Sequence, residues 1–242
     1  MNPVDIDPDW ITQSLAEHEH GLESDVWRAV ETLDAVALLR LVDTLDELLV
    51  LEKILADGLP PLPLDTAHLH PLLSTPFRFT SPYPSRFRPP QAPGIWYGAD
   101  SPEAACTEVG YWRWRFLLDS EGLRHGELVG THALFHALVA GHCLNLDSPP
   151  WNGLAAHWSH PTDIRACQTL AELAKIPAKP VQWIRYPSAR SRDGHCAAVF
   201  DPQALTVVAP HAQETWVIKI TAQRLIFSHA KERMEVATEG WI

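Results

Sequence analysis

The chain has 242 residues, 46% of them hydrophobic, which allows one large domain or one domain with an extension. Its net charge of −11 argues against direct binding of DNA or RNA, and it has no apolar run of the roughly 18–20 residues that a membrane helix needs. Residues 1–59 carry 14 acidic and 3 basic residues, whereas residues 60–242 carry 16 of each, so the excess charge lies in the first quarter.

The N-terminus, MNPVDIDPDW, is acidic and lacks the basic region of a secretory signal. The cysteines show neither a CxxC pair nor zinc spacing, so we expect small buried thiols in a reducing cytoplasm. They are Cys106, Cys143, Cys167 and Cys196.

Residues 25–57 place apolar side chains every three to four positions, which predicts helix. These side chains are Val26, Val30, Leu33, Ala37, Leu41, Leu45, Leu48 and Leu55. Ser24 is the predicted N-cap and Gly58 follows the predicted end, while Thr44 and Glu47 fit a capping box that would begin a second helix. Two interpretations stay open: a helical layer packed on the main domain, or an acidic surface for a protein partner.

Two proline-rich segments follow, at residues 60–71 and 80–93. The first predicts a boundary between an acidic helical extension, 1–59, and a main domain, 60–242. The second cannot form regular structure, yet it carries Arg86 and Arg88, with Arg78 just upstream. Since a planar guanidinium suits phosphate oxygens, we regard all three arginines as candidate phosphate ligands.

The main domain then alternates between predicted strands and predicted helices. Residues 94–99 predict a strand, and a helix capped by Asp100 or Ser101 begins with Pro102 and runs to about Leu118. A second, amphipathic helix is predicted at 163–175. Further strands are predicted at 131–141, 181–186, 196–200 and 215–220. The predicted class is α+β, a mixed β core with flanking helices.

Two residues are expected to share a cleft at the first strand–helix junction. Glu108 lies on a helix face that also carries Ala104 and Tyr111, and an inward carboxylate is costly unless it is paired or functional. Tyr97 lies on the strand just before that helix. Ordinary structural roles stay open for both, as a glutamate at the domain edge and a core tyrosine.

Ser188 follows Pro187 between two predicted strands, without the G-x-S-x-G elbow of a hydrolase, so a simple turn serine also stays open. The sequence has no H-E-x-x-H, Walker A or GxGxxG motif, and we expect no catalytic metal.

The order of these features resembles the RES domain, a family named for its Arg, Glu and Ser. The matching stretches are FRFTSPYPSRFRPPQAPGIWYGADSPEAACTEVGYWRWRFL (77–117) and WIRYPSARSRDGHCAAVFDP (183–202). The most specific element is the eleven-residue spacing from Tyr97 to Glu108. Residues 160–175 also resemble the larger RES subgroup that carries an N-terminal helical extension.

The resemblance implies a fold similar to ADP-ribosyltransferases and a toxin that consumes NAD⁺ and is neutralised by an Xre-type DNA-binding antitoxin. By position, Arg86 would hold the NAD⁺ diphosphate, with Arg78 and Arg88 as further candidates. Tyr97 would stack on the nicotinamide, and Glu108 would lie beside the nicotinamide ribose. Ser188 would orient a ribose or the glutamate.

Three functions fit this resemblance. The first is hydrolysis or phosphorolysis of NAD⁺, and the second is transfer of ADP-ribose from NAD⁺ to a cellular protein. The third is a catalytically inactive module that only binds a partner. We expect residues 1–59 to pack on the main domain and to support homo-oligomers.

Overall fold

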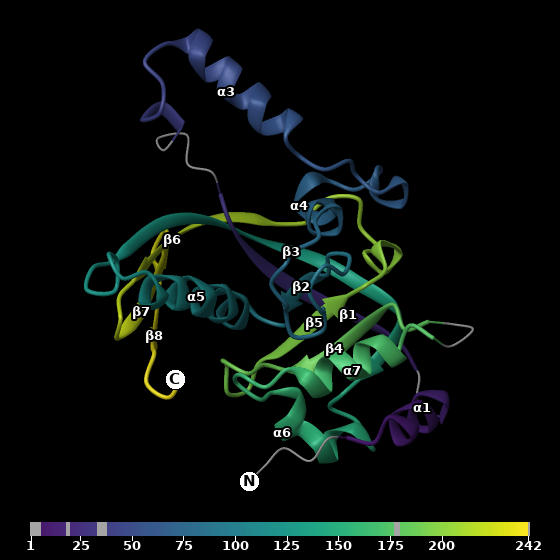
Figure 1. The fold of residues 1–242 in the computed structure, drawn as a ribbon. Helices are drawn as coiled ribbons and strands as arrows, with labels where there is room; N and C mark the ends of the chain where they lie inside the picture. Colours follow the sequence, from purple (N-terminus) through teal and green to yellow (C-terminus); the bar gives the residue numbers. More distant parts are fainter. Residues whose placement is uncertain (1–5, 18–19, 33–37, 177–179, 242) are drawn as a thin grey trace.

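The computed structural model describes residues 6–17, 20–32, 38–176 and 180–241. The α-helices are α1 (Pro8–Glu17), α3 (Leu45–Asp57), α4 (Pro71–Ser74), α5 (Pro102–Asp119), α6 (Ala155–Trp158) and α7 (Arg165–Leu173). The strands are β1 (His20–Glu31), β2 (Trp96–Ala99), β3 (Leu128–Asn145), β4 (Trp183–Pro187), β5 (His195–Val199), β6 (Gln213–Ile220), β7 (Arg224–His229) and β8 (Glu232–Ala237). This arrangement confirms the predicted α+β class, a mixed β core with flanking helices (Figure 1).

Five strands close on themselves. The sheet runs β1-β2-β5-β4-β3, and β1 also pairs with β3, from His20 opposite Cys143 to Glu31 opposite His132. The β3–β4 pairing is parallel and the other pairings of this ring are antiparallel. Strands β6, β7 and β8 continue from β3 as an antiparallel meander.

Side chains alternate between the two sides of this ring, as the pleat requires. One cluster gathers inward-facing side chains of all five strands, among them Val26, Trp96, Phe135, Trp183 and Val199. The other lies outside the ring, against α5 and α7, and includes Ala99, Leu134, Tyr186 and Trp114. Each fully buried large side chain contributes roughly 1.5–3 kcal/mol, so both sides of the ring stabilise it.

The N-terminal segment corrects the helical prediction for residues 25–31. Ser24 is not an N-cap but lies within β1, opposite Val139. The prediction failed because the four-residue spacing of Val26 and Val30 fits a strand as well as a helix. In a strand every second side chain lies on the same face, so Val26, Arg28 and Val30 share one face of β1. Leu33 and Ala37 of the predicted helix lie outside the described residues.

The second half of that prediction is confirmed. Helix α3 begins after Thr44, whose side chain accepts a hydrogen bond from the Glu47 N–H at 3.2 Å, and it ends at Asp57 before Gly58. The Glu47 carboxylate in turn accepts from the Asp43 N–H at 2.7 Å. Such a cap contributes about 1 kcal/mol to helix stability.

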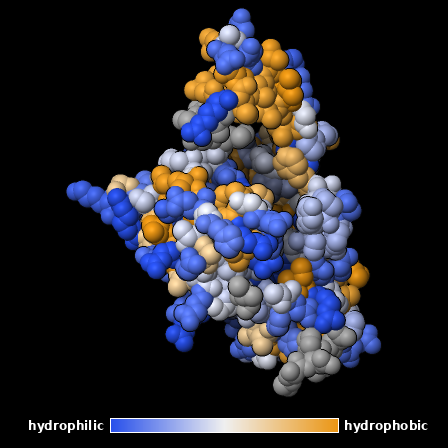
Figure 2. All heavy atoms as spheres, turned by 60° about the vertical axis from the view of Figure 1, so that its left-hand side comes forward, coloured by the Kyte–Doolittle hydropathy of each residue, from blue (hydrophilic) through white to orange (hydrophobic). Residues whose placement is uncertain are grey.

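Helix α3 stands away from the sheet (Figure 1), and apolar atoms gather on its surface (Figure 2). It has no buried residue, and Leu45 and Ile54 are 71% and 62% exposed. The expected packing of the N-terminal segment on the main domain therefore holds for β1 but not for α3. The domain boundary at residues 59 and 60 stays a prediction, and β1 on its N-terminal side is part of the main sheet.

None of the described helices is long and apolar enough to cross a membrane.

Candidate active site

The strand–helix junction from Tyr97 to Glu108 forms as the sequence predicts. Strand β2 ends at Ala99, and the Ser101 side chain caps α5 by accepting a hydrogen bond from the Ala104 N–H at 3.1 Å. Pro102 occupies the first turn, where its missing N–H costs nothing. The helix directs Ala104 and Tyr111 into the core and leaves Glu108, on the same side, half-buried.

Glu108 is paired with Ser188, from the loop between β4 and β5. The Ser188 hydroxyl donates to Glu108 Oε1 at 2.5 Å, and the Cys196 thiol lies 3.8 Å from the same oxygen. Ser188 itself accepts hydrogen bonds from the Arg190 and Ser191 N–H groups at 3.1 and 2.9 Å. The carboxylate is thus held in one orientation by a serine that its own loop fixes.

Gly194 lets this loop approach α5. A Cβ at this position would lie 2.9 Å from the Ala104 Cβ and 2.8 Å from the Ser191 Oγ, closer than real Cβ atoms come. The Ser188 N–H donates to the Gly194 carbonyl at 2.8 Å, which closes the loop on itself. A side chain at position 194 would therefore push Ser188 away from Glu108.

Arg86, in the second proline-rich segment at residues 80–93, lies on the approach to the Glu108 carboxylate. Its Nη1 and Nη2 donate to the carbonyls of Trp158 and His160 at 2.9 and 3.0 Å. Burial lowers the pKa of this guanidinium, but neighbouring groups that include Cys167, Tyr186 and Glu108 raise it above its ordinary value. The two bonds use two of the five guanidinium N–H donors, and the cation lies within electrostatic reach of the Glu108 carboxylate.

Tyr97 holds the residues on both sides of Arg86. Its hydroxyl lies 2.9 Å from the Ser85 Oγ and accepts from the Phe87 N–H at 3.2 Å. The Gln168 side chain adds a second clamp, because it donates to the carbonyls of Ser85 and Arg88 at 3.1 and 3.2 Å. Burial raises the pKa of Tyr97, so the phenol stays protonated.

The other two candidate arginines have structural contacts. Arg88 is 9% exposed and donates to three carbonyls of its own loop, those of Ser81, Tyr83 and Ala92. Arg78 donates from Nε to the Pro60 carbonyl at 2.6 Å. Arg88 thus holds the loop in shape and Arg78 ties to the linker before it, whereas Arg86 is the one of the three whose pKa the charge of Glu108 raises.

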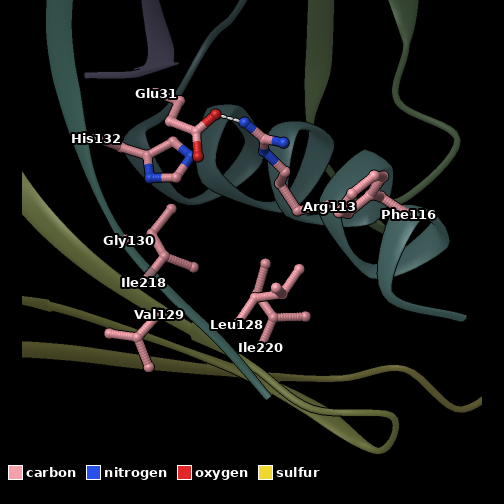
Figure 3. Close-up of a pocket in the computed structure, with 9 residues that line it drawn as sticks. All are labelled: Glu31, Arg113, Phe116, Leu128, Val129, Gly130, His132, Ile218 and Ile220. Carbon is pink, nitrogen blue, oxygen red and sulfur yellow. Dashed lines mark ion pairs between the residues drawn. The ribbon is translucent and has the colours of Figure 1, made fainter. Parts of the chain in front are cut away.

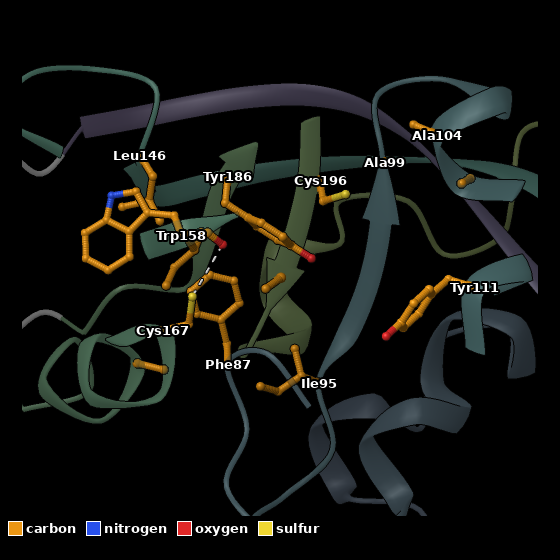
Figure 4. Close-up of a cluster of buried hydrophobic side chains, with 14 of the residues drawn as sticks. Phe87, Ile95, Ala99, Ala104, Tyr111, Leu146, Trp158, Cys167, Tyr186 and Cys196 are labelled. Carbon is orange, nitrogen blue, oxygen red and sulfur yellow. Dashed lines mark hydrogen bonds between the residues drawn. The ribbon is translucent and has the colours of Figure 1, made fainter. Parts of the chain in front are cut away.

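Two residues near Glu108 escaped the sequence analysis. Tyr186 projects from β4 beside Cys196 of β5, on the side that faces Phe87 (Figure 4). Burial, then the charges of Cys196 and Glu108, raise the pKa of Tyr186 well above its ordinary value. Its position directly before Pro187-Ser188 was the available signal.

Arg190 is the second missed residue. Its guanidinium carbon lies 3.5 Å from the centre of the Tyr111 ring, and Nη2 donates to the Pro161 carbonyl at 2.5 Å. Burial lowers its pKa, Tyr111 and Glu108 oppose that shift, and Arg86 adds to it. The site thus combines one carboxylate with two cations.

All four cysteines are buried and unpaired, as expected from their spacing. Among the described residues, no three His, Cys, Asp or Glu side chains are grouped as metal ligands would be.

Comparison with known proteins identifies the family. No curated protein matches the chain. One solved structure with a similar chain is the crystal structure of the M. tuberculosis MbcT–MbcA toxin–antitoxin complex, with 15% identity, a TM-score of 0.48, and coverage of 90% of this chain and 95% of that chain. The RES domain model matches residues 63–220, well over half of the chain. The chain therefore belongs to the RES domain family.

Proposed function

We propose that this protein is the toxin of a toxin–antitoxin pair and that it cleaves the nicotinamide–ribose bond of NAD⁺. The observation that carries the proposal is the hydrogen bond from Ser188 to Glu108, with Arg86 within electrostatic reach of the same carboxylate. Membership of the RES family, named for its Arg, Glu and Ser, supports the assignment, because Arg86, Glu108 and Ser188 lie together here.

The arrangement suits a reaction that builds positive charge on a ribose. As the bond to nicotinamide breaks, the Glu108 carboxylate stabilises the cationic sugar, and Ser188 keeps that carboxylate pointed at it. Arg86 would hold the diphosphate with its remaining N–H groups, as an arginine fork does. The Tyr97 ring would stack on the nicotinamide while its hydroxyl bonds to Ser85 and Phe87, on either side of Arg86.

The test is the substitution Glu108→Gln. Glutamine keeps an oxygen that accepts from Ser188, so the fold should persist while the negative charge disappears. We expect NAD⁺ turnover by the purified protein to fall about 10²–10³-fold, as for the loss of one electrostatic catalytic group. Glu103→Gln, in the exposed first turn of the same helix, is the matched control and should keep full activity. Full turnover by Glu108→Gln would overturn the proposal.

The acceptor of the ADP-ribose follows from the products. Incubation with NAD⁺, with and without phosphate, distinguishes hydrolysis from phosphorolysis. ADP-ribosylated peptides in cells that produce the protein would instead establish a mono-ADP-ribosyltransferase. An unchanged NAD⁺ level together with no modified peptide would instead indicate the third function, a module that only binds a partner.

Family membership also supports an Xre-type antitoxin as the partner and the cytoplasm as the location. Co-production of such an antitoxin should restore growth and NAD⁺ levels together.

A further inference from the structure

A separate pocket lies on another side of α5, between this helix and the strands β1, β3 and β6 (Figure 3). Its volume is about 160 Å³. The lining residues are Glu31, Arg113, Phe116, Leu128, Val129, Gly130, His132, Ile218 and Ile220. None of them belongs to the Glu108 site.

One polar side chain in this pocket, that of His132, makes no hydrogen bond to the described residues. His132 is 3% exposed, and neither ring nitrogen makes a hydrogen bond within the described part of the chain. Burial, and then the charge of Arg113, lower its pKa to about 4, so the imidazole is neutral at pH 7 and presents one donor and one acceptor. Buried polar groups usually have a partner, which makes this ring an unmet binding group.

The rest of the pocket is apolar or electrically balanced. Ile218 and Ile220 are 1% and 2% exposed, while Phe116 and Val129 are half exposed or more. Glu31 and Arg113 form an ion pair whose charges compensate one another (Figure 3). The pocket therefore favours a neutral molecule over a charged one.

The pocket also has room beside its backbone. A Cβ added at Gly130 would meet only the Glu31 Oε1, at 3.8 Å, which is ordinary contact. A larger side chain at this position would extend into the pocket without a clash at its base. Gly130 thus offers a way to fill the pocket from within the strand.

We propose that this pocket binds a small neutral ring compound that carries one hydroxyl or carboxamide group, with the ring against Ile218 and Ile220 and the polar group on His132. A cavity of roughly 150 Å³ lined by apolar side chains is large enough for benzene, so the size fits one ring. The proposal is independent of the activity at Glu108.

The test compares phenol, benzene and benzoate by titration of the full-length protein, with the His132 ring protons followed by nuclear magnetic resonance. We expect phenol to bind about three- to tenfold more tightly than benzene, as one hydrogen bond would give, and benzoate to bind most weakly. His132→Phe should abolish the difference between phenol and benzene. Gly130→Val should weaken both at least tenfold.

Two results would overturn the proposal: no shift of the His132 protons with phenol up to its solubility, or equal phenol binding by the wild type and Gly130→Val. Thermal unfolding of each variant shows whether it is folded. If Gly130→Val does not fold, the comparison with His132→Phe still decides, since equal preference for phenol in that variant contradicts the proposed contact.

Discussion

Replacing Ser188 with alanine removes three hydrogen bonds at once. The hydroxyl donates to Glu108 Oε1 at 2.5 Å and accepts from the Arg190 and Ser191 N–H groups at 3.1 and 2.9 Å. A hydrogen bond to a charged group contributes about 1.5–3 kcal/mol and a neutral one about 0.5–1.5 kcal/mol. Because the two N–H groups belong to half-buried residues that water can reach, we expect the free energy of unfolding to fall by about 2–3 kcal/mol.

The same substitution should lower kcat much more than it changes KM. Without Ser188 the Glu108 carboxylate loses its fixed orientation, so kcat for NAD⁺ consumption should fall about 10–100-fold while KM changes little. Urea denaturation and initial-rate kinetics measure the two effects. Ser191→Ala, in the same loop, is the matched control, because its side chain is not the one bonded to Glu108. A Ser188→Ala protein with wild-type kcat and an unchanged urea midpoint would refute this reasoning.

Four other altered proteins test the ring, the arginine loop and the buried histidine. Removing residues 1–59 deletes β1, the partner of β2 and β3, and should abolish cooperative thermal unfolding. Arg88→Ala should lower the melting temperature because three carbonyls lose their donor, whereas Arg86→Ala should lower NAD⁺ turnover about 10²-fold with an unchanged circular dichroism spectrum. His132 protonates near pH 6.5 when unfolded but near pH 4 when folded, so the free energy of unfolding should fall by about 3 kcal/mol as pH drops across this range, and His132→Phe should remove this loss.

Three outcomes would contradict these expectations. A protein that begins at Pro60 and unfolds cooperatively would show that β1 is dispensable. Equal turnover by Arg86→Ala and the wild type would remove Arg86 from the substrate site. An unchanged pH profile in His132→Phe would assign the acid sensitivity to other groups.

The elements predicted well are those with local signals. Ser101 and Pro102 mark the start of α5 by their own chemistry, and Thr44 with Glu47 marks the start of α3. The strands around Tyr97 and Ser188 were also predicted, because short apolar runs between turn residues indicate strands. These local signals placed Tyr97 and Glu108 on adjoining elements before the fold was known.

The elements predicted poorly depend on distant contacts. Nothing near Arg28 in the sequence indicates that its Nη1 donates to the Tyr97 carbonyl, 69 positions away, or that β1 pairs along β3. Strands β7 and β8 were not predicted, although they pair with each other through a tight turn. Arg190 likewise could not be predicted as a site residue, because its cation–π contact is with Tyr111, on another element. Such pairings follow from the closed ring, which a local pattern does not encode.

The ring also has a consequence for protein synthesis. Arg86, Tyr97 and Glu108 leave the ribosome well before Ser188, and β5 is the last strand of the ring to be made. Because β5 pairs with both β2 and β4, a nascent chain that stops before His195 has neither a closed ring nor the strand beside Tyr97. Translation products that end before β5 should therefore be inactive, and the assembled Glu108–Ser188 pair arises only when about four fifths of the chain has been synthesised.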